Sequence, residues 1–510
     1  MGDHRHQQRR DRARGGRPAA RRGTLRALGR RAERWPGGLE RRPADAAAAR
    51  TGRAGPDLVA VTHPPPPRPR LFSITWPLFV ELLLGIGVGL VGTALAARVS
   101  DAAGGAFALT NHVAATLFVV FRIIGAGIGV VVTQSLGAGQ TASAQRLARA
   151  ALGASTWIGG GTALVAWLGA APLMRLMNAP ADVVPLAVPF LMMLAPAMLG
   201  DAWNASMASV MRAHLRTRDT LAVIIAMHAC HLLLAVPLMV GAGPVPALGL
   251  PGYALALLGS RVLGLGLHLW LWRLRLGLVP RAQDWWHAPR RELAAMLRIG
   301  LPGAAENIGY RLGFMVSVAV AAGMGAQALA TQAYTSQLMY GVLLFGLATG
   351  LAVEILVGHL VGAGELKAAH RLVKRALSRG LLVSLLVAAA VALASPWLLR
   401  AFTQDPQIIA AGSTLLWMTV LLEPGRTFNL VLVNALRAAG DARYPVMAGA
   451  ASMLVVLAGG SWLFGSVLGW GLPGIWLAYI ADEWIRGLLM WRRWATLGWL
   501  PHARQARSGH

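Results

Sequence analysis

The chain has 510 residues, of which 55% are hydrophobic and only 14% charged, and its formal net charge is +27. Its apolar runs exceed the roughly 20 residues that cross a hydrocarbon core of about 30 Å, which excludes a soluble fold of this size. The single cysteine, Cys230, excludes an intramolecular disulfide and a cysteine-clustered metal site. The two lysines, Lys367 and Lys374, follow no Gly-x-x-x-x-Gly motif, so a Walker A phosphate loop is absent and ATP is not the expected energy source.

Residues 1–70 differ in composition from the rest of the chain. They hold 18 Arg against 6 Asp plus Glu and are rich in Ala, Gly and Pro. Such a segment lacks the apolar residues for a core, so we expect a disordered basic tail, or an upstream stretch that is not translated in the cell. We assign it no function and expect no nucleic-acid partner.

Twelve apolar spans follow the tail, and an amphipathic segment divides them into two sets of six. That segment, residues 281–300, has Trp285 and Trp286 suited to a headgroup interface and is predicted to be a linker helix. The expected units are an N-terminal six-helix bundle at 71–280, this cytoplasmic linker helix, a C-terminal six-helix bundle at 301–497 and a cytoplasmic tail at 498–510. The spans are predicted at 72–97, 105–134, 144–172, 182–211, 218–242, 250–275, 301–323, 326–360, 372–399, 407–436, 444–467 and 471–496.

The two sets of spans repeat each other at an offset of 225 residues. The matches include residue types that are costly inside a membrane, which chance does not readily place at one spacing. Because six spans per copy is an even number, both copies enter the membrane in the same orientation, related by an axis along its normal. The sequence therefore predicts an all-α integral membrane protein whose twelve transmembrane helices form two pseudo-symmetric six-helix bundles. The matched residues are Pro77, Glu81, Gly125, Arg146, Asn204 and Arg212 in the first copy, and Pro302, Glu306, Gly350, Arg371, Asn429 and Arg437 in the second.

One glycine run recurs at the same offset, as Gly137–Gly139 and Gly362–Gly364. Each run follows an apolar helix and lacks the Lys partner of a phosphate-binding loop. Both are therefore predicted to be helix stops.

Loop charges predict the sidedness of the chain. Basic residues precede the first span and follow every second span, whereas loops such as 241–249 and 465–471 carry no charge. By the positive-inside rule both termini are cytoplasmic, in a multi-pass protein of the plasma (bacterial inner) membrane.

The carboxylates singled out within the apolar spans are Glu81, Asp201, Glu306, Glu354 and Glu423. An ionised carboxylate that faces lipid costs several kcal/mol, so these side chains should face the bundle interior or a water-filled cleft. They are the candidates for binding a coupling ion. Glu81 and Glu306 lead, because each lies one helical turn after a Pro that frees a backbone carbonyl, and Glu354 is an auxiliary candidate.

Further polar residues are candidates for ion or substrate binding. Arg426 lies three residues after Glu423, within reach on one helix face, and this pair can be structural. Asp201 and Arg426 occupy equivalent positions in the two repeats, which permits a pair across the bundles. Asn204 and Asn429 can supply oxygens to Na⁺, hydrogen bonds to a drug, or interhelical packing.

The chain from about 70 to 497 resembles the multidrug and toxin extrusion (MATE) family. The resemblance implies two six-helix bundles around a central V-shaped cleft, and export of organic cations or other amphipathic compounds in exchange for Na⁺ or H⁺. We further expect a monomer without a cofactor, and no metal beyond a transported Na⁺. The segments that carry it are WPLFVE at 76–81, TQSLGAG at 133–139, LPGAAEN at 301–307, EILVGHLVGAG at 354–364 and EPGRTFNLVLVNALRAAGD at 423–441.

The chain departs from the family at two positions. Many members carry an Asp in the first helix, in a Val-Asp-Thr type sequence, where this chain has Val91-Gly92-Thr93. A Glu found along the seventh helix of one branch falls near Tyr310 or Arg311. Ion coupling is therefore expected to use other carboxylates.

The resulting prediction is a secondary-active exporter that works by alternating access and is not an enzyme. The nearest alternative is a flippase for a lipid-linked saccharide, which would need a strongly basic cleft for pyrophosphate, whereas the intramembrane charges here are mixed. A membrane-embedded enzyme would need a nucleophile-base or metal constellation, and the sequence contains no His-Glu-x-x-His motif or comparable cluster.

Overall fold

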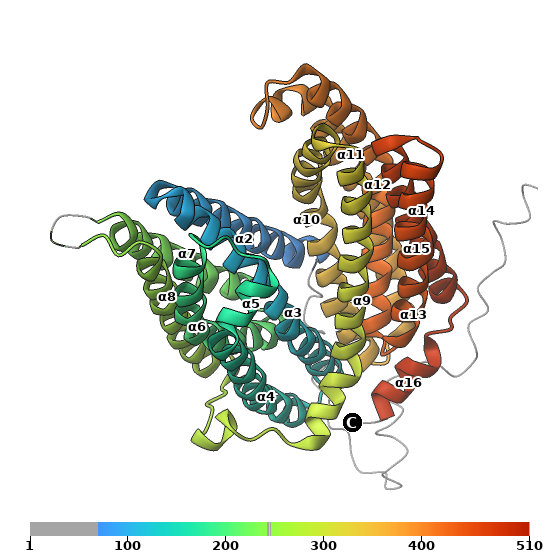
Figure 1. The fold of residues 1–510 in the computed structure, drawn as a ribbon. Helices are drawn as coiled ribbons and strands as arrows, with labels where there is room; N and C mark the ends of the chain where they lie inside the picture. The colour runs from blue at the N-terminus through green and yellow to red at the C-terminus, as the bar shows by residue number, and fades with distance from the viewer. Residues whose placement is uncertain (1–69, 242–243, 245, 509–510) are drawn as a thin grey trace, which may run out of the picture. The chain divides into compact units, whose positions relative to one another are not determined.

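The computed structural model describes residues 70–508 except 242, 243 and 245, without the side chains of residues 118–124, 126, 507 and 508. Every element among the described residues is a helix (Figure 1). The predicted basic tail lies outside the described residues, apart from Arg70.

The N-terminal half contains six long helices and one short one, α5, which directly follows α4. Each long helix coincides with one predicted span, and α4 with α5 covers the third. They are α2 (Leu71–Val99), α3 (Asp101–Gly137), α4 (Thr141–Leu168), α5 (Ala170–Leu176), α6 (Val184–Ala213), α7 (Thr217–Val240) and α8 (Leu250–Leu276).

The C-terminal half repeats the arrangement, with its fifth span divided by two π-helical segments. Nine helical stretches of the described chain are long and apolar enough to cross a membrane, and α3, α9 and α15 complete two sets of six. The predicted all-α architecture of twelve transmembrane helices is confirmed. The elements are α9 (Arg290–Gly323), α10 (Ala326–Gly362), α11 (Leu366–Arg400), α12 (Pro406–Ala438), α13 (Arg443–Ser452), η2 (Met453–Gly459), α14 (Gly460–Trp462), η3 (Leu463–Val467), α15 (Gly471–Ala495) and α16 (Leu500–Ser508).

Glycines end α3 and α10 in the same way. Gly139 and Gly364 have φ angles of +74° and +75°, in the left-handed region that glycine adopts without a steric cost. The predicted helix stops at Gly137–Gly139 and Gly362–Gly364 are confirmed.

The linker between the halves differs from the prediction of one helix over 281–300. It contains a single turn, η1 (Ala282–Trp285), after which the chain enters α9 at Arg290. Pro289 precedes this first residue, where its missing N–H breaks no hydrogen bond within the helix, and α9 then runs on into the seventh span. The first turns of α9 thus replace the C-terminal part of the predicted linker helix.

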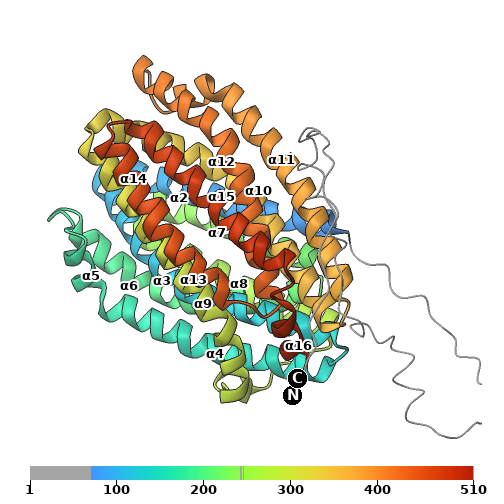
Figure 2. The same ribbon diagram turned by 90° about the vertical axis from the view of Figure 1, so that its right-hand side faces the viewer.

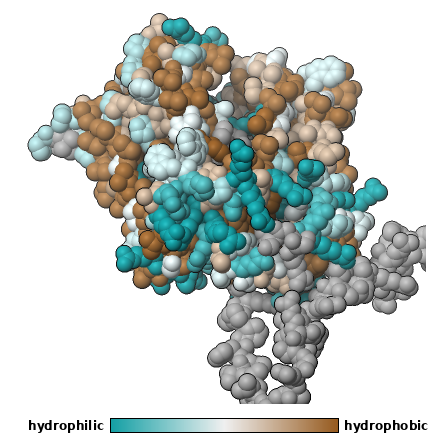
Figure 3. Space-filling model, turned by 90° about the horizontal axis from the view of Figure 1, so that it is seen from below, coloured by the Kyte–Doolittle hydropathy of each residue, from teal (hydrophilic) through white to brown (hydrophobic). Residues whose placement is uncertain are grey.

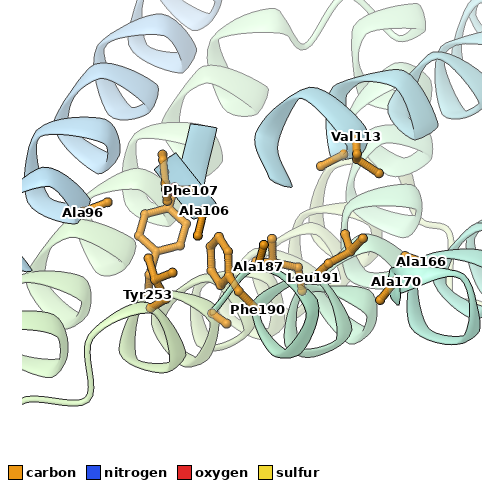
Figure 4. Packing of buried hydrophobic residues seen from close by; sticks show 14 of the residues in the cluster. Ala96, Ala106, Phe107, Val113, Ala166, Ala170, Ala187, Phe190, Leu191 and Tyr253 are labelled. Carbon is orange, nitrogen blue, oxygen red and sulfur yellow. The ribbon is translucent and has the colours of Figure 1, made fainter. Parts of the chain in front are cut away.

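Each half has its own apolar core. In the N-terminal half, the rings of Phe107, Phe190 and Tyr253 pack together, with centroids 4.9–6.0 Å apart (Figure 4). In the C-terminal half, α12, α15 and the run α13–η3 lie together beside α9 (Figure 2), and Trp476 and Tyr479 of α15 pack among leucines of α12. These cores fix the helices that carry the polar residues described below.

The halves meet at the end of the helices connected by residues 138–140, 214–216, 277–289, 363–365 and 439–442, here named the basic end. There α3 contacts α9 and α10, and α2 contacts α10. The approach is close: a Cβ on Gly127 would lie 2.1 Å from the carbonyl oxygen of Met296. Seen from this end, hydrophilic side chains gather over the face (Figure 3).

Candidate functional site

Two ion pairs recur in the two halves near the basic end. Arg212 Nη1, at the end of α6, lies 2.7 Å from Glu81 Oε1 of α2. Arg437, at the end of α12, pairs in the same way with Glu306 of α9. The partners are 131 residues apart in both cases, so the repeat preserves the whole pair.

Both leading candidates for ion coupling, Glu81 and Glu306, are members of these ion pairs. Glu81 and Glu306 face protein and not lipid, with side chains 19% and 13% exposed. Each carboxylate has a guanidinium partner that compensates its charge, which the sequence analysis did not predict. Such a pair favours a role in holding α2 to α6 and α9 to α12.

Two hydrogen bonds join the halves reciprocally at the basic end. Gln134 Nε2 of α3 donates to the carbonyl oxygen of Ala438, the last residue of α12, at 2.8 Å. His359 Nε2 of α10 lies 2.7 Å from the carbonyl oxygen of Ala213, the last residue of α6. His359 and Ala438 lie 225 positions after Gln134 and Ala213, so the two bonds are related by the repeat.

Glycines let α3 and α10 approach closely enough for these bonds. A Cβ on Gly137 would lie 2.1 Å from the carbonyl oxygen of His359, and one on Gly362 would lie 2.0 Å from that of Gln134. Side chains at either position would push the halves apart. The glycines predicted to be helix stops therefore also form the crossing of the two halves.

The interior of the N-terminal half holds a balanced pair of charges. Arg261 of α8 pairs with Asp201 of α6, so the cross-bundle pair of Asp201 with Arg426 that the sequence permitted is not formed. Asn204, one turn further along α6, donates to the carbonyl oxygen of Arg261 at 3.0 Å and contacts His268 Nδ1 at 2.9 Å. Its amide is thus engaged in interhelical packing.

The position of the missing first-helix Asp is filled by aromatic rings. A Cβ on Gly92 would lie 2.8 Å from Phe107 and 3.0 Å from Tyr253. An Asp at this position would have to displace both rings, which also contact Phe190 (Figure 4). This packing agrees with the expectation that coupling does not use a carboxylate at position 92.

The C-terminal half buries a larger network, centred on Arg426 of α12. Arg426 Nη1 donates to Glu423 Oε1 at 2.6 Å, which confirms that these two residues pair on one helix face. Arg426 Nε donates to Glu483 Oε1 of α15 at 3.2 Å. Asn429 Nδ2 donates to Glu483 Oε2 at 2.9 Å, while the buried Asn429 Oδ1 has no hydrogen-bond partner among the described residues.

The network continues along α15. Arg486 Nη2 lies 2.6 Å from Asp482 Oδ2 and 3.0 Å from Glu483 Oε1. Ser452, the residue before the π-helical segment η2, donates to Asp482 Oδ1 at 2.6 Å. The guanidinium carbon of Arg486 lies 6.0 Å from the ring centre of Tyr310.

The charges of this network do not cancel. Its three carboxylates, Glu423, Asp482 and Glu483, face two guanidiniums, Arg426 and Arg486, which leaves a formal charge of −1 when all five are ionised. The five residues are 1% to 4% exposed. A surplus charge in so dry a place is costly, so the arrangement favours uptake of one positive charge.

Comparison with known proteins identifies the chain. The sequence profile of the MatE family matches residues 77–237 and 302–462, one stretch in each half. The chain belongs to the MATE family. It is 34% identical over 430 residues to the uncharacterized transporter YisQ of Bacillus subtilis, covering 84% of this chain and 94% of YisQ. It is 24% identical over 430 residues to a probable multidrug resistance protein NorM of Thermotoga maritima, covering 83% of this chain and 91% of NorM.

Solved MATE structures share the fold. The Vibrio cholerae MATE transporter VcmN in its bent form superposes with a TM-score of 0.76 at 20% identity, over 86% of this chain and 97% of VcmN. A MOP superfamily transporter from Pyrococcus furiosus superposes with a TM-score of 0.73 at 15% identity, over 86% and 96% of the chains. The chain is thus a multi-pass membrane transporter of the MATE family and not an enzyme.

Three members of the charged network in this MATE protein were missed from the sequence: Asp482, Glu483 and Arg486. Two signals were available. All three lie within the last apolar span, where charge is costly. Arg486 also lies 225 positions after Arg261, so an arginine recurs at this position in both repeats.

Proposed function

We propose that this protein is a secondary-active exporter of small organic cations or other amphipathic compounds, driven by cation antiport through alternating access. Relatives of similar length are named multidrug resistance proteins, among them NorM of Thermotoga maritima and PmpM of Pseudomonas aeruginosa. The observation that supports this proposal most directly is the surplus negative charge buried between α12 and α15.

The proton is the coupling ion that suits this network best. Arg426 and Arg486 contact the carboxylates directly and would repel a metal cation that entered the network. A proton needs one carboxylate oxygen only. Glu423 is the acceptor in this proposal, because the other two carboxylates suffice for the two guanidiniums: Glu483 contacts both and Asp482 contacts Arg486.

Alternating access requires that the two halves part at the basic end and close again. The pairs Glu81–Arg212 and Glu306–Arg437 hold helices within each half, and the bonds of Gln134 and His359 join the halves. We therefore assign Glu81 and Glu306 to the rigidity of the moving halves, in place of the coupling role that their sequence positions suggested. In this scheme the proton and the drug favour different conformational states of the transporter. Binding of one therefore promotes release of the other.

The basic end is proposed to face the cytoplasm, with both termini inside. In a chain whose native Cys230 is replaced by Ser, a cysteine at Asp182, exposed between α5 and α6, should react with impermeant thiol reagents in intact cells. A cysteine at Ala142, exposed at the start of α4, should react only after permeabilisation. The opposite labelling pattern would reverse the topology.

The proposal is tested by efflux from cells or vesicles that contain the protein. Ethidium and a panel of other organic cations are loaded, and the pH and Na⁺ gradients are set independently. We expect a pH gradient alone to drive efflux and a Na⁺ gradient alone to have no effect. Efflux that follows the Na⁺ gradient would refute the proton assignment, and no gradient-driven efflux of any compound would refute the function.

A further inference from the structure

Glu354 of α10 lies where the two halves meet. Its equivalent in the first repeat, 225 positions earlier, is Gly129 of α3. A Cβ on Gly129 would lie 3.9 Å from Glu354 Oε1. A residue next to its own repeat equivalent lies close to the axis that relates the repeats. Glu354 is therefore a carboxylate present once, near the pseudo-twofold axis, in space that Gly129 leaves open.

Charges from both halves surround this carboxylate. Arg437 and Arg212 both act on Glu354 electrostatically, and each already has a carboxylate partner, in Glu306 and Glu81 respectively. Among the residues that the structure describes, no ion pair or hydrogen bond engages Glu354 itself. Together with Glu306 and Glu81, Glu354 makes three carboxylates beside the two guanidiniums of Arg437 and Arg212. When all five groups are ionised, their formal charge is −1.

The closed contact keeps water away from Glu354, which is 8% exposed. One turn further along α10, a Cβ on Gly358 would lie 2.2 Å from Thr133 Oγ1 of α3, and the crossing of Gly137 with Gly362 follows. An ionised carboxylate buried without a partner of its own is costly, whereas the same group is hydrated once the halves part.

We propose that Glu354 binds a proton when the halves close at the basic end and releases it when they open. This inference rests on the alternating access proposed above. Because the closed state then binds more protons than the open state, acid pH favours closure and alkaline pH favours opening. Among the described residues, the charged groups that act on Glu354 are Arg212 of α6 and Arg437 of α12, which are paired with Glu81 of α2 and Glu306 of α9.

Two histidines also lie near the contact: His214, and His359, whose Nε2 lies 2.7 Å from the carbonyl oxygen of Ala213. Burial lowers the pKa of His214, the residue after α6, below its usual value. This side chain is therefore neutral at neutral pH and adds no charge beside the bond between His359 and Ala213.

The test measures opening directly and without transport. In the full chain with Cys230→Ser, Thr133→Cys places a thiol on α3 against α10, where Thr133 is 1% exposed. Its labelling rate by a small thiol reagent is measured from about pH 5.5 to about pH 8.5, with and without Glu354→Gln. The ratio of the two rates at each pH cancels the pH dependence of the thiol chemistry. Ser155→Cys, buried between α4 and α6 inside one half, is the control for general unfolding.

We expect the rate with Glu354, relative to Glu354→Gln, to rise with pH by up to about tenfold per pH unit, the limit for one proton. Glu354→Asp should retain a pH dependence, whereas Asp182→Asn, which removes an exposed carboxylate at the other end, should leave the wild-type profile unchanged. A ratio independent of pH would overturn the proposal. So would faster labelling of Glu354→Gln at every pH, which would show that the ionised carboxylate holds the halves together.

The outcome separates this inference from the proposed function. If the ratio is flat but proton-driven efflux persists, the role of Glu354 fails while the transporter stands. If the ratio changes with pH but no gradient drives efflux, protonation of Glu354 controls opening at the basic end while the antiport proposal fails.

Discussion

Replacement of Glu423 by Gln is expected to reduce proton-driven efflux by about tenfold or more while ethidium binding changes by less than about threefold. The amide keeps the volume of the side chain and a hydrogen-bond acceptor for Arg426, whose Nη1 lies 2.6 Å from Glu423 Oε1. It cannot take up a proton, and the remaining two carboxylates balance the two guanidiniums. The proton therefore loses its binding site while the network stays folded.

Efflux and equilibrium ethidium binding are measured at matched expression. Glu423→Asp keeps a titratable carboxylate and should retain part of the efflux, and Asp182→Asn controls for loss of a carboxylate elsewhere. Wild-type efflux in Glu423→Gln would reject the assignment. An equal loss of binding and efflux would make Glu423 a structural or drug-binding residue.

A methyl group at the helix crossing is the second change with a large expected effect. In Gly362→Ala the new Cβ would lie 2.0 Å from the carbonyl oxygen of Gln134, a backbone atom that cannot turn aside. We expect closure at the basic end to weaken by about 1–3 kcal/mol, the usual cost of overpacking. That energy corresponds to about 5–150-fold in the opening equilibrium.

The measurements are the labelling rate of Thr133→Cys, which should rise, and the efflux rate, which should fall. Gly137→Ala should act alike, because its Cβ would lie 2.1 Å from the carbonyl oxygen of His359. Gly341→Ala is the matched control in α10, since a Cβ there would meet nothing within 4 Å. Unchanged labelling in both crossing variants would show that the halves do not close through this contact.

The order of elements was predictable from sequence because it depends on local patterns. Apolar length and the 225-residue repeat sufficed for the twelve spans, and three-residue spacing sufficed for the pair of Glu423 with Arg426. The linker was misjudged, because nothing in its composition shows that the helix from Arg290 continues without a break into the seventh span.

Long-range partners were harder to foresee. Glu81 and Arg212 both recur at the same offset, yet their contact across 131 residues depends on the packing of the whole half, which brings the end of α6 near α2. The joint recurrence of a carboxylate and a guanidinium is a signal that could have been used. Gln134 and His359 differ in type, so sequence matching alone could not show that they make equivalent bonds.

The most direct test of proton antiport is proton release on drug binding by the purified protein. Ethidium is added to the protein in weakly buffered detergent solution, and the protons released are counted with a pH indicator. The account predicts proton release on ethidium binding by the wild type, and release that is smaller by about one proton per ethidium in Glu423→Gln, because drug and proton favour different states. Binding without proton release by the wild type, or the same release by Glu423→Gln, would contradict it.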